Sequence, residues 1–242
     1  MKRFHNRTVI VTGGARGMSA SFARGFAADG AKVVIADALE QAGRWLAAEL
    51  ADHAIFSRLN VTSDKDWAAT VAAAGDAFGP VSVLVNKAAS VRFGPIAETE
   101  PEAWRQVIDI NLTGAYLGSA RSRPRSQGGR RRDRKYFRSR RDDRGLASYV
   151  ASKWGLLGLT KTAALELARN EICVNSIHPG GTHTPMTAGP DTAALAAAAV
   201  RHWRSSVSQS RKRSRAWCCS SRLTRQFATS CMNSPAGAAT SS

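Results

Sequence analysis

The amino-acid sequence predicts an α/β fold in which helices cover both faces of a parallel β-sheet. From Thr8 onward, short β-branched runs alternate with longer Ala-rich amphipathic segments, which is typical of repeated βαβ units. A glycine-rich turn joins the first of these runs to the first Ala-rich segment. The chain has 242 residues, 43% of them hydrophobic, enough to bury one sizeable core. We therefore expect a single domain over residues 1–242.

The strands are predicted from β-branched runs that are bounded by turn residues. They are expected at 8–12, 31–37, 54–61, 81–86 and 172–179. Helices are expected between them. One begins at about Pro101, because proline suits the first turn of a helix, and runs through "EAWRQVIDINLTGAYLG". Another is the segment "SYVASKWGLLGLTKTAALELA", which precedes the last strand.

Two basic islands interrupt this pattern. Between Ser119 and Arg144, twelve Lys and Arg stand against three Asp, and between Arg201 and Arg225 eight stand against no acid. The islands account for the whole formal net charge of +17, so the rest of the chain is neutral. Neither shows apolar alternation or a continuous apolar run. We therefore expect a fifth strand and the C-terminal elements to be lost or disordered, with 119–144 and 195–242 as irregular basic segments.

The charge distribution decides which partners are expected. A net charge of +17 ordinarily indicates nucleic acid or an anionic membrane surface, but a neutral core argues against a specific nucleic-acid partner. A basic nucleic-acid-binding protein on a dinucleotide-binding fold is the alternative. No apolar run approaches the roughly 20 residues of a membrane span, so no membrane partner is expected. The four cysteines show no CxxC pair, and His178 and His183 have no third ligand, so we expect a cytoplasmic protein without a metal.

The glycine turn has the composition of a phosphate-binding site. In "VIVTGGARGMSASFARGFA" it lies between a strand and a helix, where backbone N–H groups and the positive helix end can receive a pyrophosphate. Gly13 and Gly17 allow close backbone approach. Asp37 closes the second strand, where its carboxylate can accept hydrogen bonds from an adenosine ribose and repel a 2′-phosphate. The sequence therefore predicts NAD rather than NADP.

The segment "SYVASK" places Tyr149 and Lys153 four residues apart, on one face of a helix. A phenol with an ordinary pKa of about 10 is a poor base at neutral pH. A nearby ammonium favours the phenolate, which brings proton transfer within reach. The pair is also common on helix surfaces, so the prediction depends on its combination with the other motifs.

Six motifs occur in a fixed order: the glycine turn, Asp37, "NKAA", "NLTG", "SYVASK" and "HPGGTHTPM". With them, residues 5–118 and 145–190 resemble the short-chain dehydrogenase/reductase family, and look closest to its bacterial 3-oxoacyl reductase-like enzymes and 3α(20β)-hydroxysteroid dehydrogenases. The resemblance implies a Rossmann-type, three-layer αβα fold. It also implies an NAD-dependent oxidoreductase that interconverts a secondary alcohol and a ketone, with a steroid or acyl substrate, and a homotetramer.

The resemblance also implies roles for single residues. Tyr149 matches the residue that donates or accepts the proton, Lys153 the one that binds the nicotinamide ribose, and Asn111 the one that holds a water in the proton relay. Asn86 matches the residue that closes the cofactor cleft. The expected cofactor contacts are Gly13, Arg16, Gly17, Met18, Asp37, Asn60, Val61, Asn86, Ala88, Tyr149, Lys153, Pro179, Gly180, Thr182 and Thr184.

Several positions depart from the family pattern. Ser19 replaces the last glycine of the turn, Lys87 and Ala89 change "NNAG" to "NKAA", and Asn60 replaces an Asp; each change is expected to weaken cofactor binding. The family's catalytic Ser lies about a dozen residues before the Tyr, where this chain has Tyr136 and Phe137. The oxyanion-stabilising hydroxyl is therefore unassigned, and we expect little or no activity from this chain.

The two islands can be explained by reading frame. If "DRKYF" (133–137) is encoded as GAT CGT AAA TAT TTC and followed by C, dropping the first base gives Ile-Val-Asn-Ile-Ser, the strand that the family has there. For "AWCC" (216–219), dropping two bases gives Leu, Met or Val, then Val and Leu, whatever codons are used. We hypothesise that 119–144 and 195–242 are frameshifted. A frameshifted product without function is thus a further alternative.

Overall fold

The computed structural model describes residues 2–122, 131–136, 145–168, 170 and 172–177. For residues 131–136 the description covers the backbone. All these residues belong to one compact unit, Met1–Met186. The expectation of a single domain over residues 1–242 stays a prediction, because the whole chain after Ile177 lies outside the described residues.

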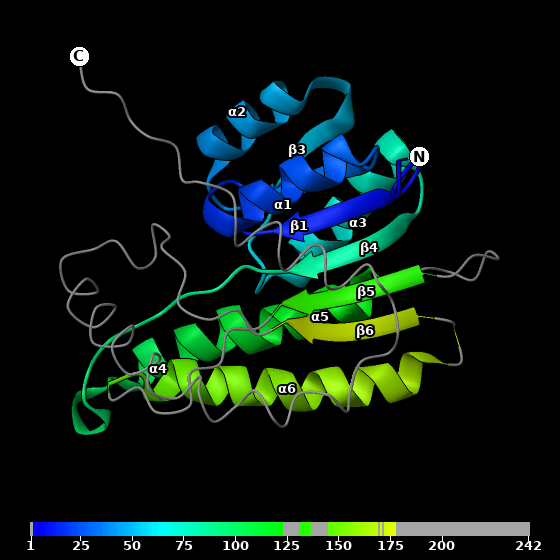
Figure 1. Ribbon diagram of the computed structural model, residues 1–242. Coiled ribbons are helices and arrows are strands. Elements are labelled where there is room, and N and C mark those ends of the chain that lie inside the picture. The colour runs from blue at the N-terminus through cyan, green and yellow to red at the C-terminus, as the bar shows by residue number, and fades with distance from the viewer. Residues whose placement is uncertain (1, 123–130, 137–144, 169, 171, 178–242) are drawn as a thin grey trace, which may run out of the picture. The chain divides into compact units, whose positions relative to one another are not determined.

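Six parallel strands form the sheet, in the spatial order β3-β2-β1-β4-β5-β6 (Figure 1). The order runs outward in both directions from β1 and β4, so the sheet is doubly wound and of the Rossmann type, as predicted. In such a sheet a crevice opens at the carboxyl ends of the two strands where the order reverses. The strands are β1 Thr8–Thr12, β2 Lys32–Asp37, β3 Ala54–Arg58, β4 Val81–Asn86, β5 Arg131–Tyr136 and β6 Ile172–Ile177.

Helices connect the strands and complete the αβα layers. They are α1 Gly17–Ala28, α2 Glu40–Leu50, α3 Asp64–Phe78, α4 Pro101–Ile108, α5 Gly114–Arg121 and α6 Ala147–Ala168. A π-helical turn, Asp109–Thr113, joins α4 to α5, and short 3₁₀ turns lie at Ala51–His53 and Ile96–Glu98. The helix predicted from Pro101 is therefore present, but one wide turn interrupts it.

Both faces of the sheet are covered, because successive strand residues point to opposite sides. On one face, Ile10 and Val34 pack with Trp67 of α3. The α5 helix contacts α3, and the π-helical turn contacts both α5 and α6, so these helices form one layer. On the other face Phe56, which pairs in register with Ile35, lies against α2, where a Cβ on Gly43 would be 2.3 Å from the Phe56 ring. Between these layers, β1, β2 and β4 are buried over most of their length.

Strand β3 ends three residues before the predicted boundary. The side-chain oxygen of Asn60 accepts a hydrogen bond from the Thr62 N–H at 3.1 Å, which bends the chain into a turn. Ser63 then caps α3, accepting a hydrogen bond from the Asp66 N–H at 3.1 Å. The apolar pattern over 54–61 gives no indication of this turn, because Leu59 and Val61 stay buried after the strand has ended.

The expectation that the fifth strand would be lost was wrong. Arg131–Tyr136 forms β5, which pairs in parallel with β4 (Val83 with Arg132, Val85 with Arg134) and with β6. Strand pairing uses backbone N–H and C=O groups that every residue except proline carries, whereas the apolar patterns used for the prediction report side-chain burial. The segment 119–144 is thus not irregular throughout, since it also contains the end of α5. The C-terminal segment 195–242 lies outside the described residues.

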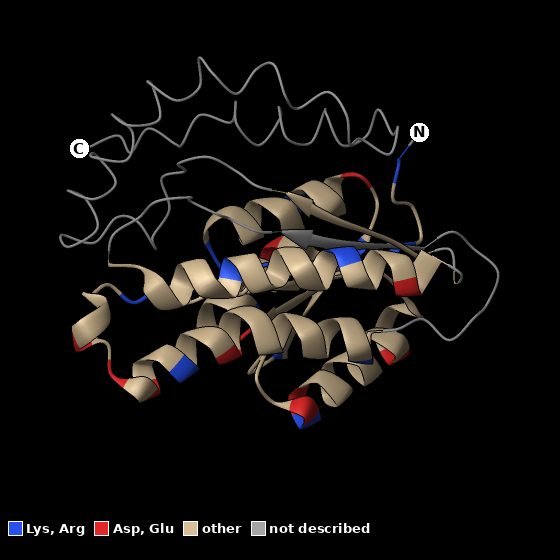
Figure 2. Ribbon diagram, turned by 90° about the horizontal axis from the view of Figure 1, so that it is seen from below, with Lys and Arg blue, Asp and Glu red and all other residues tan. Residues whose placement is uncertain are grey.

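Charged residues of both signs are interspersed on the described helices (Figure 2). Two ion pairs connect neighbouring helices: Arg24 of α1 donates to Glu49 of α2 at 2.6 Å, and Arg121 of α5 donates to Asp64 of α3 at 2.7 Å. Exposed pairs of this kind contribute little to stability. Apart from Arg121, which lies in the first basic island, the mixed signs agree with the balanced charge predicted for the chain outside the two islands.

Candidate active site

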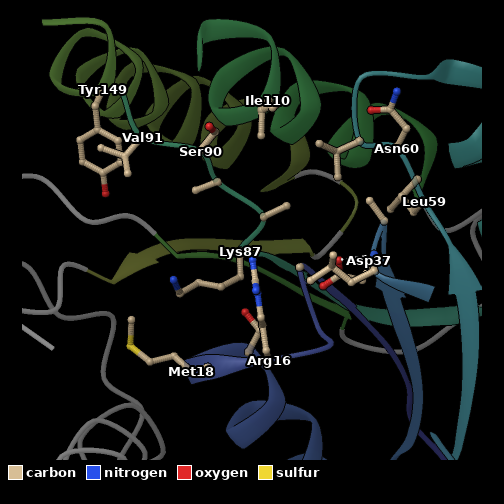
Figure 3. A pocket seen from close by; sticks show the side chains of 18 of the residues that line it. Arg16, Met18, Asp37, Leu59, Asn60, Lys87, Ser90, Val91, Ile110 and Tyr149 are labelled. Atoms are coloured by element: carbon tan, nitrogen blue, oxygen red, sulfur yellow. Dashed lines mark hydrogen bonds between the residues drawn. The ribbon is translucent and has the colours of Figure 1, made fainter. Parts of the chain in front are cut away.

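A cavity of about 440 Å³ lies at the carboxyl ends of β1, β2 and β4, where the strand order reverses (Figure 3). The glycine turn before α1, the loop after β4 and helix α6 supply its walls. Its lining residues are Gly13, Arg16, Gly17, Met18, Ser19, Asp37, Ala38, Leu39, Leu59, Asn60, Val61, Lys87, Ala88, Ala89, Ser90, Val91, Ile110, Tyr149 and Lys153.

The glycine turn packs directly against the loop after β4. Gly13 and Gly17 have φ angles of +61° and +62°, which side chains disfavour. A Cβ on Gly13 would lie 2.9 Å from the Cα of Ala88. The Thr12 hydroxyl oxygen accepts hydrogen bonds from the N–H groups of Lys87 at 2.8 Å and Ala88 at 3.1 Å. The two backbones are thus held together, and α1 begins at the cavity with its N-terminus.

Asp37 lies at the end of β2 with its side chain fixed by the backbone. One carboxylate oxygen accepts a hydrogen bond from the Ala15 N–H at 2.9 Å, and the other from the Leu39 N–H at 2.9 Å. The residue is buried yet lines the cavity. Each oxygen retains a lone pair that can accept from a ligand hydroxyl.

Asn60 and Val61 line the cavity from the loop between β3 and α3. The N–H of Asn60 donates to the Asp66 carboxylate at 2.9 Å, and the Trp67 indole N–H donates to the Val61 carbonyl at 2.9 Å. The hydrogen bond from the Asn60 backbone, followed by that from the Ser63 hydroxyl, lowers the pKa of Asp66 below its ordinary value. The first turn of α3 therefore holds this wall of the cavity.

Tyr149 and Lys153 lie one turn apart on α6, as the sequence predicted. Both line the cavity, and they are only 7% and 5% exposed. The Lys153 ammonium nitrogen lies 5.1 Å from the centroid of the Tyr149 ring. Tyr149 also packs with Val107 of α4 and Leu146, which fixes its ring. In Figure 3 its hydroxyl points into the cavity.

Asn111 does not line the cavity but fixes two residues around it. It lies in the π-helical turn and is only 1% exposed. Its side-chain oxygen accepts from the Ser90 N–H at 2.7 Å, and its amide nitrogen donates to the Ser90 carbonyl and the Ser152 hydroxyl, each at 3.0 Å. The loop after β4 is thereby tied to α6 beside Tyr149. Single π-helical turns are frequent at functional sites.

The predicted site residues fall into three groups. Asn86 is buried beside the cavity, where its side chain donates to the Ala115 carbonyl at 3.2 Å; Asn111 is likewise close to the cavity without lining it. Pro179, Gly180, Thr182 and Thr184 lie outside the described residues. The ten that line the cavity together are Gly13, Arg16, Gly17, Met18, Asp37, Asn60, Val61, Ala88, Tyr149 and Lys153.

Some lining residues were not predicted as contacts. Lys87 and Ser19 were noticed only as departures from a pattern, and Ser90, Val91 and Ile110 carried no signal in the sequence. Their positions next to the predicted motifs could have identified them, because each follows or precedes a motif residue by at most a few positions. Lys87 is the one that adds a charge to the cavity.

Within the residues that the structure describes, no three His, Cys, Asp or Glu side chains cluster as metal ligands would. No helix in this part of the chain has the length and apolar character to cross a membrane.

The comparisons with known proteins agree with this geometry. A model of the short chain dehydrogenase family matches residues 7–193. The chain is 41% identical to the trans-4-hydroxycyclohexanecarboxylate dehydrogenase of Sinomonas cyclohexanicum over 198 residues, which are 77% of this chain and 76% of that protein. It is 43% identical to the 3-alpha-(or 20-beta)-hydroxysteroid dehydrogenase of Mycobacterium tuberculosis over 192 residues, 76% of this chain and 72% of that protein.

One solved structure is informative about a cofactor. The 3-ketoacyl-(acyl-carrier-protein) reductase of Brucella melitensis, whose crystal structure is a complex with NADH, is 27% identical with a TM-score of 0.68. The match covers 75% of this chain and 78% of that chain.

Proposed function

The chain belongs to the short-chain dehydrogenase family of oxidoreductases, and on that premise we propose that it interconverts a secondary alcohol and a ketone with NAD(H). One observation carries the proposal. Tyr149 and Lys153 share a cavity with the glycine turn and Asp37, so a proton-transfer pair and a dinucleotide cradle open onto the same space.

The cavity residues fit a nicotinamide dinucleotide. At Gly13 the backbones of the glycine turn and of the loop after β4 approach so closely that a Cβ would collide with Ala88. The first helical residues, Gly17 and Met18, line the cavity, so α1 begins there. A helix N-terminus with exposed N–H groups is suited to a pyrophosphate. When bound, the cofactor supplies or accepts the hydride.

Asp37 supports NAD over NADP. Hydrogen bonds from Ala15 and Leu39 hold its carboxylate in one orientation at the end of β2. The carboxylate can accept from the two ribose hydroxyls of an adenosine, while a 2′-phosphate there would meet a fixed negative charge.

We assign the proton transfer of the reaction to Tyr149. The Lys153 ammonium lies close to its ring in a buried site, and a nearby positive charge favours the phenolate form. Tyr149 Oη then donates a proton to a ketone oxygen in reduction and accepts one from the alcohol in oxidation. Asn111 acts as a positioning residue, because its side chain binds both Ser90 of the loop after β4 and Ser152 of α6, the helix that carries Tyr149; the family resemblance adds a relay water there.

The names of the relatives support the substrate class. They refer to a hydroxylated cyclohexane carboxylate and to hydroxysteroids. We therefore favour an alcohol on an alicyclic ring system, such as a steroid, over an acyl substrate. Exposed apolar side chains on α4 and α6, namely Trp104, Trp154 and Leu165, support self-association, because such side chains often mark protein contacts; the homotetramer is what the family resemblance implies.

The turnover of this chain is expected to be low. The family uses a hydroxyl at the end of the fifth strand, and here Tyr136 ends β5 and Phe137 follows it. Removing one donor that stabilises a developing oxyanion costs about 10²–10³-fold in rate.

The test is a comparison of Tyr149→Phe with Tyr116→Phe. Tyr116 is 54% exposed on α5 and lies outside the cavity, so it is the matched control. With NAD and trans-4-hydroxycyclohexanecarboxylate or a hydroxysteroid, Tyr149→Phe should lose about 10²–10⁴-fold of the residual turnover and keep its affinity for NADH. Unchanged turnover in Tyr149→Phe, or no binding of NADH by the wild type, would refute the proposal.

A further inference from the structure

The cavity contains a cation that the proposed mechanism does not use. Lys87 lies in the loop after β4 at a position where the family pattern has a neutral Asn. Figure 3 shows Lys87 and Arg16 reaching into the cavity from opposite sides, Lys87 from this loop and Arg16 from the glycine turn before α1. Neither residue is a surface charge remote from the site.

The backbone of Lys87 is fixed beside the glycine turn. Its N–H donates to the Thr12 hydroxyl oxygen at 2.8 Å, and the next residue, Ala88, is bound to the same oxygen. Thr12 in turn donates to the Val85 carbonyl of β4 at 3.3 Å. The lysine side chain therefore starts from a fixed backbone position beside the glycine turn that precedes α1.

The described lining of the cavity holds more basic than acidic side chains. Among the residues that the structure describes, Arg16, Lys87 and Lys153 line it together with the carboxylate of Asp37. Asp37 is oriented by two backbone N–H groups, and Lys153 lies against Tyr149. Arg16 belongs to the glycine turn, and Lys87 belongs to the loop packed against that turn. The diphosphate of a dinucleotide is doubly negative and belongs between the glycine turn and this pair.

We propose that Lys87, together with Arg16, binds the cofactor's diphosphate and strengthens cofactor binding. This inference rests on the proposed function of the cavity. It reverses the expectation that the change from "NNAG" to "NKAA" weakens the cofactor site: an ammonium has three donors and a compact charge that suits phosphate oxygens, where an Asn offers one neutral amide.

The experiment measures the affinity for ADP-ribose, which has the diphosphate but no nicotinamide, by calorimetry. Lys87→Met keeps the length and the apolar stem of the side chain and removes its charge, so affinity should fall about tenfold or more. Lys87→Arg keeps the charge and should stay within about threefold of the wild type. Adenosine, measured as a competitor of ADP-ribose, lacks the phosphates and should bind Lys87→Met and the wild type equally.

Lys161→Met is the matched control for net charge, because Lys161 is exposed on α6 and lies outside the cavity. Equal losses in Lys161→Met and Lys87→Met, or an unchanged affinity in Lys87→Met, overturn the inference. A loss for adenosine as large as that for ADP-ribose also overturns it, because Lys87 would then act on the shape of the site. If the wild type binds neither NADH nor ADP-ribose, the proposed function fails as well, and the two failures are thus distinguished.

Discussion

In the proposed function, Asp37 is the residue that favours NAD over NADP. Its two carboxylate oxygens accept hydrogen bonds from the N–H groups of Ala15 and Leu39, so the side chain connects the glycine turn to the end of β2. A neutral side chain at this position keeps the shape but loses the charge that would repel a 2′-phosphate.

Asp37→Asn should therefore reduce the preference for NADH over NADPH by about tenfold or more. It should also lower the free energy of unfolding by about 1–2 kcal/mol, because one of the two backbone N–H groups loses its acceptor. Fluorescence titrations with both cofactors measure the preference. Asp76→Asn, an exposed position on α3, should change neither quantity. An unaltered preference in Asp37→Asn would contradict the assignment of NAD.

Gly13 tests whether the two backbones must approach closely. Gly13→Ala places a Cβ 2.9 Å from Ala88 at a φ of +61°, which should cost about 2 kcal/mol or more of stability and abolish ADP-ribose binding. Gly75 lies inside α3 with no atom within 4 Å of an added Cβ, so Gly75→Ala should stabilise the protein by about 0.5–1 kcal/mol. Urea unfolding compares the free energies of unfolding of Gly13→Ala and Gly75→Ala. Equal effects of the two substitutions would refute the packing argument.

At this scale the sequence predicted several residues that line the cavity. Gly13 and Asp37 lie at the ends of β1 and β2, and a parallel sheet brings such ends to one edge, whereas Tyr149 lies in a short motif on α6. The sequence did not predict the contacts that join separate motifs. The hydrogen bonds of Asn111 to Ser90 and Ser152, and the reach of Lys87 into the cavity, depend on how separate elements pack.

Among the elements, α3 has a direct influence on the cavity through its first turn. Ser63 and Asp66 cap each other: the Ser63 hydroxyl donates to the Asp66 carboxylate at 2.8 Å and accepts from the Asp66 N–H. Asp66 also accepts from the N–H of Asn60, a cavity residue. Loss of the cap should therefore loosen the cavity wall formed by Asn60 and Val61 as well as the helix.

Ser63→Ala should destabilise the protein by about 1 kcal/mol and raise the pKa of Asp66 only partly, because the Asn60 hydrogen bond is its first cause. Since the folded pKa of Asp66 is lowered, its contribution is present above the ordinary pKa of about 3.9 and is lost as pH falls through the folded value. Carboxyl NMR titration measures the pKa of Asp66 in the wild type and in Ser63→Ala. Ser63→Thr retains the cap and should match the wild type; an unshifted Asp66 in the wild type would contradict the cap.

The elements also show which patterns sequence reasoning can recognise. The buried strands β1 and β4 were predicted with their observed bounds, because their apolar residues are continuous. The π-helical turn was not predicted, since one extra residue hardly alters an apolar period over a helix. The strand β5 was missed because its backbone pairing leaves no trace in the charged residues of that segment.

In the molecule as a whole, β5 is the element whose sequence and position disagree. It lies between β4 and β6, whose residues Val83, Val85 and Ile172 are buried, yet its sequence is "RRDRKY". Charges in a sheet interior cost several kcal/mol unless they are paired. The frameshift hypothesis accounts for this disagreement, and resequencing the encoding DNA should find compensating single-base differences around residues 119–144 and 195–242.

Restoring the strand in the protein itself gives the decisive test. The replacement reads Ile-Val-Asn-Ile-Ser and consists of Asp133→Ile, Arg134→Val, Lys135→Asn, Tyr136→Ile and Phe137→Ser. It should raise the free energy of unfolding, because apolar residues then stand between β4 and β6, beside the buried residues Val83, Val85 and Ile172. It should also raise turnover by about 10²-fold or more, because it supplies the missing hydroxyl.

A second version that ends in Phe137→Ala separates the two effects. It should gain the stability without the turnover, since it has the strand and lacks the hydroxyl. Urea unfolding and NADH formation with a ring alcohol measure them for all three chains. If neither replacement stabilises the protein, the charged strand is compatible with its neighbours and the frameshift loses its physical support. If the two replacements turn over equally, the residue after β5 does not stabilise the oxyanion, and that hydroxyl must come from elsewhere in the chain.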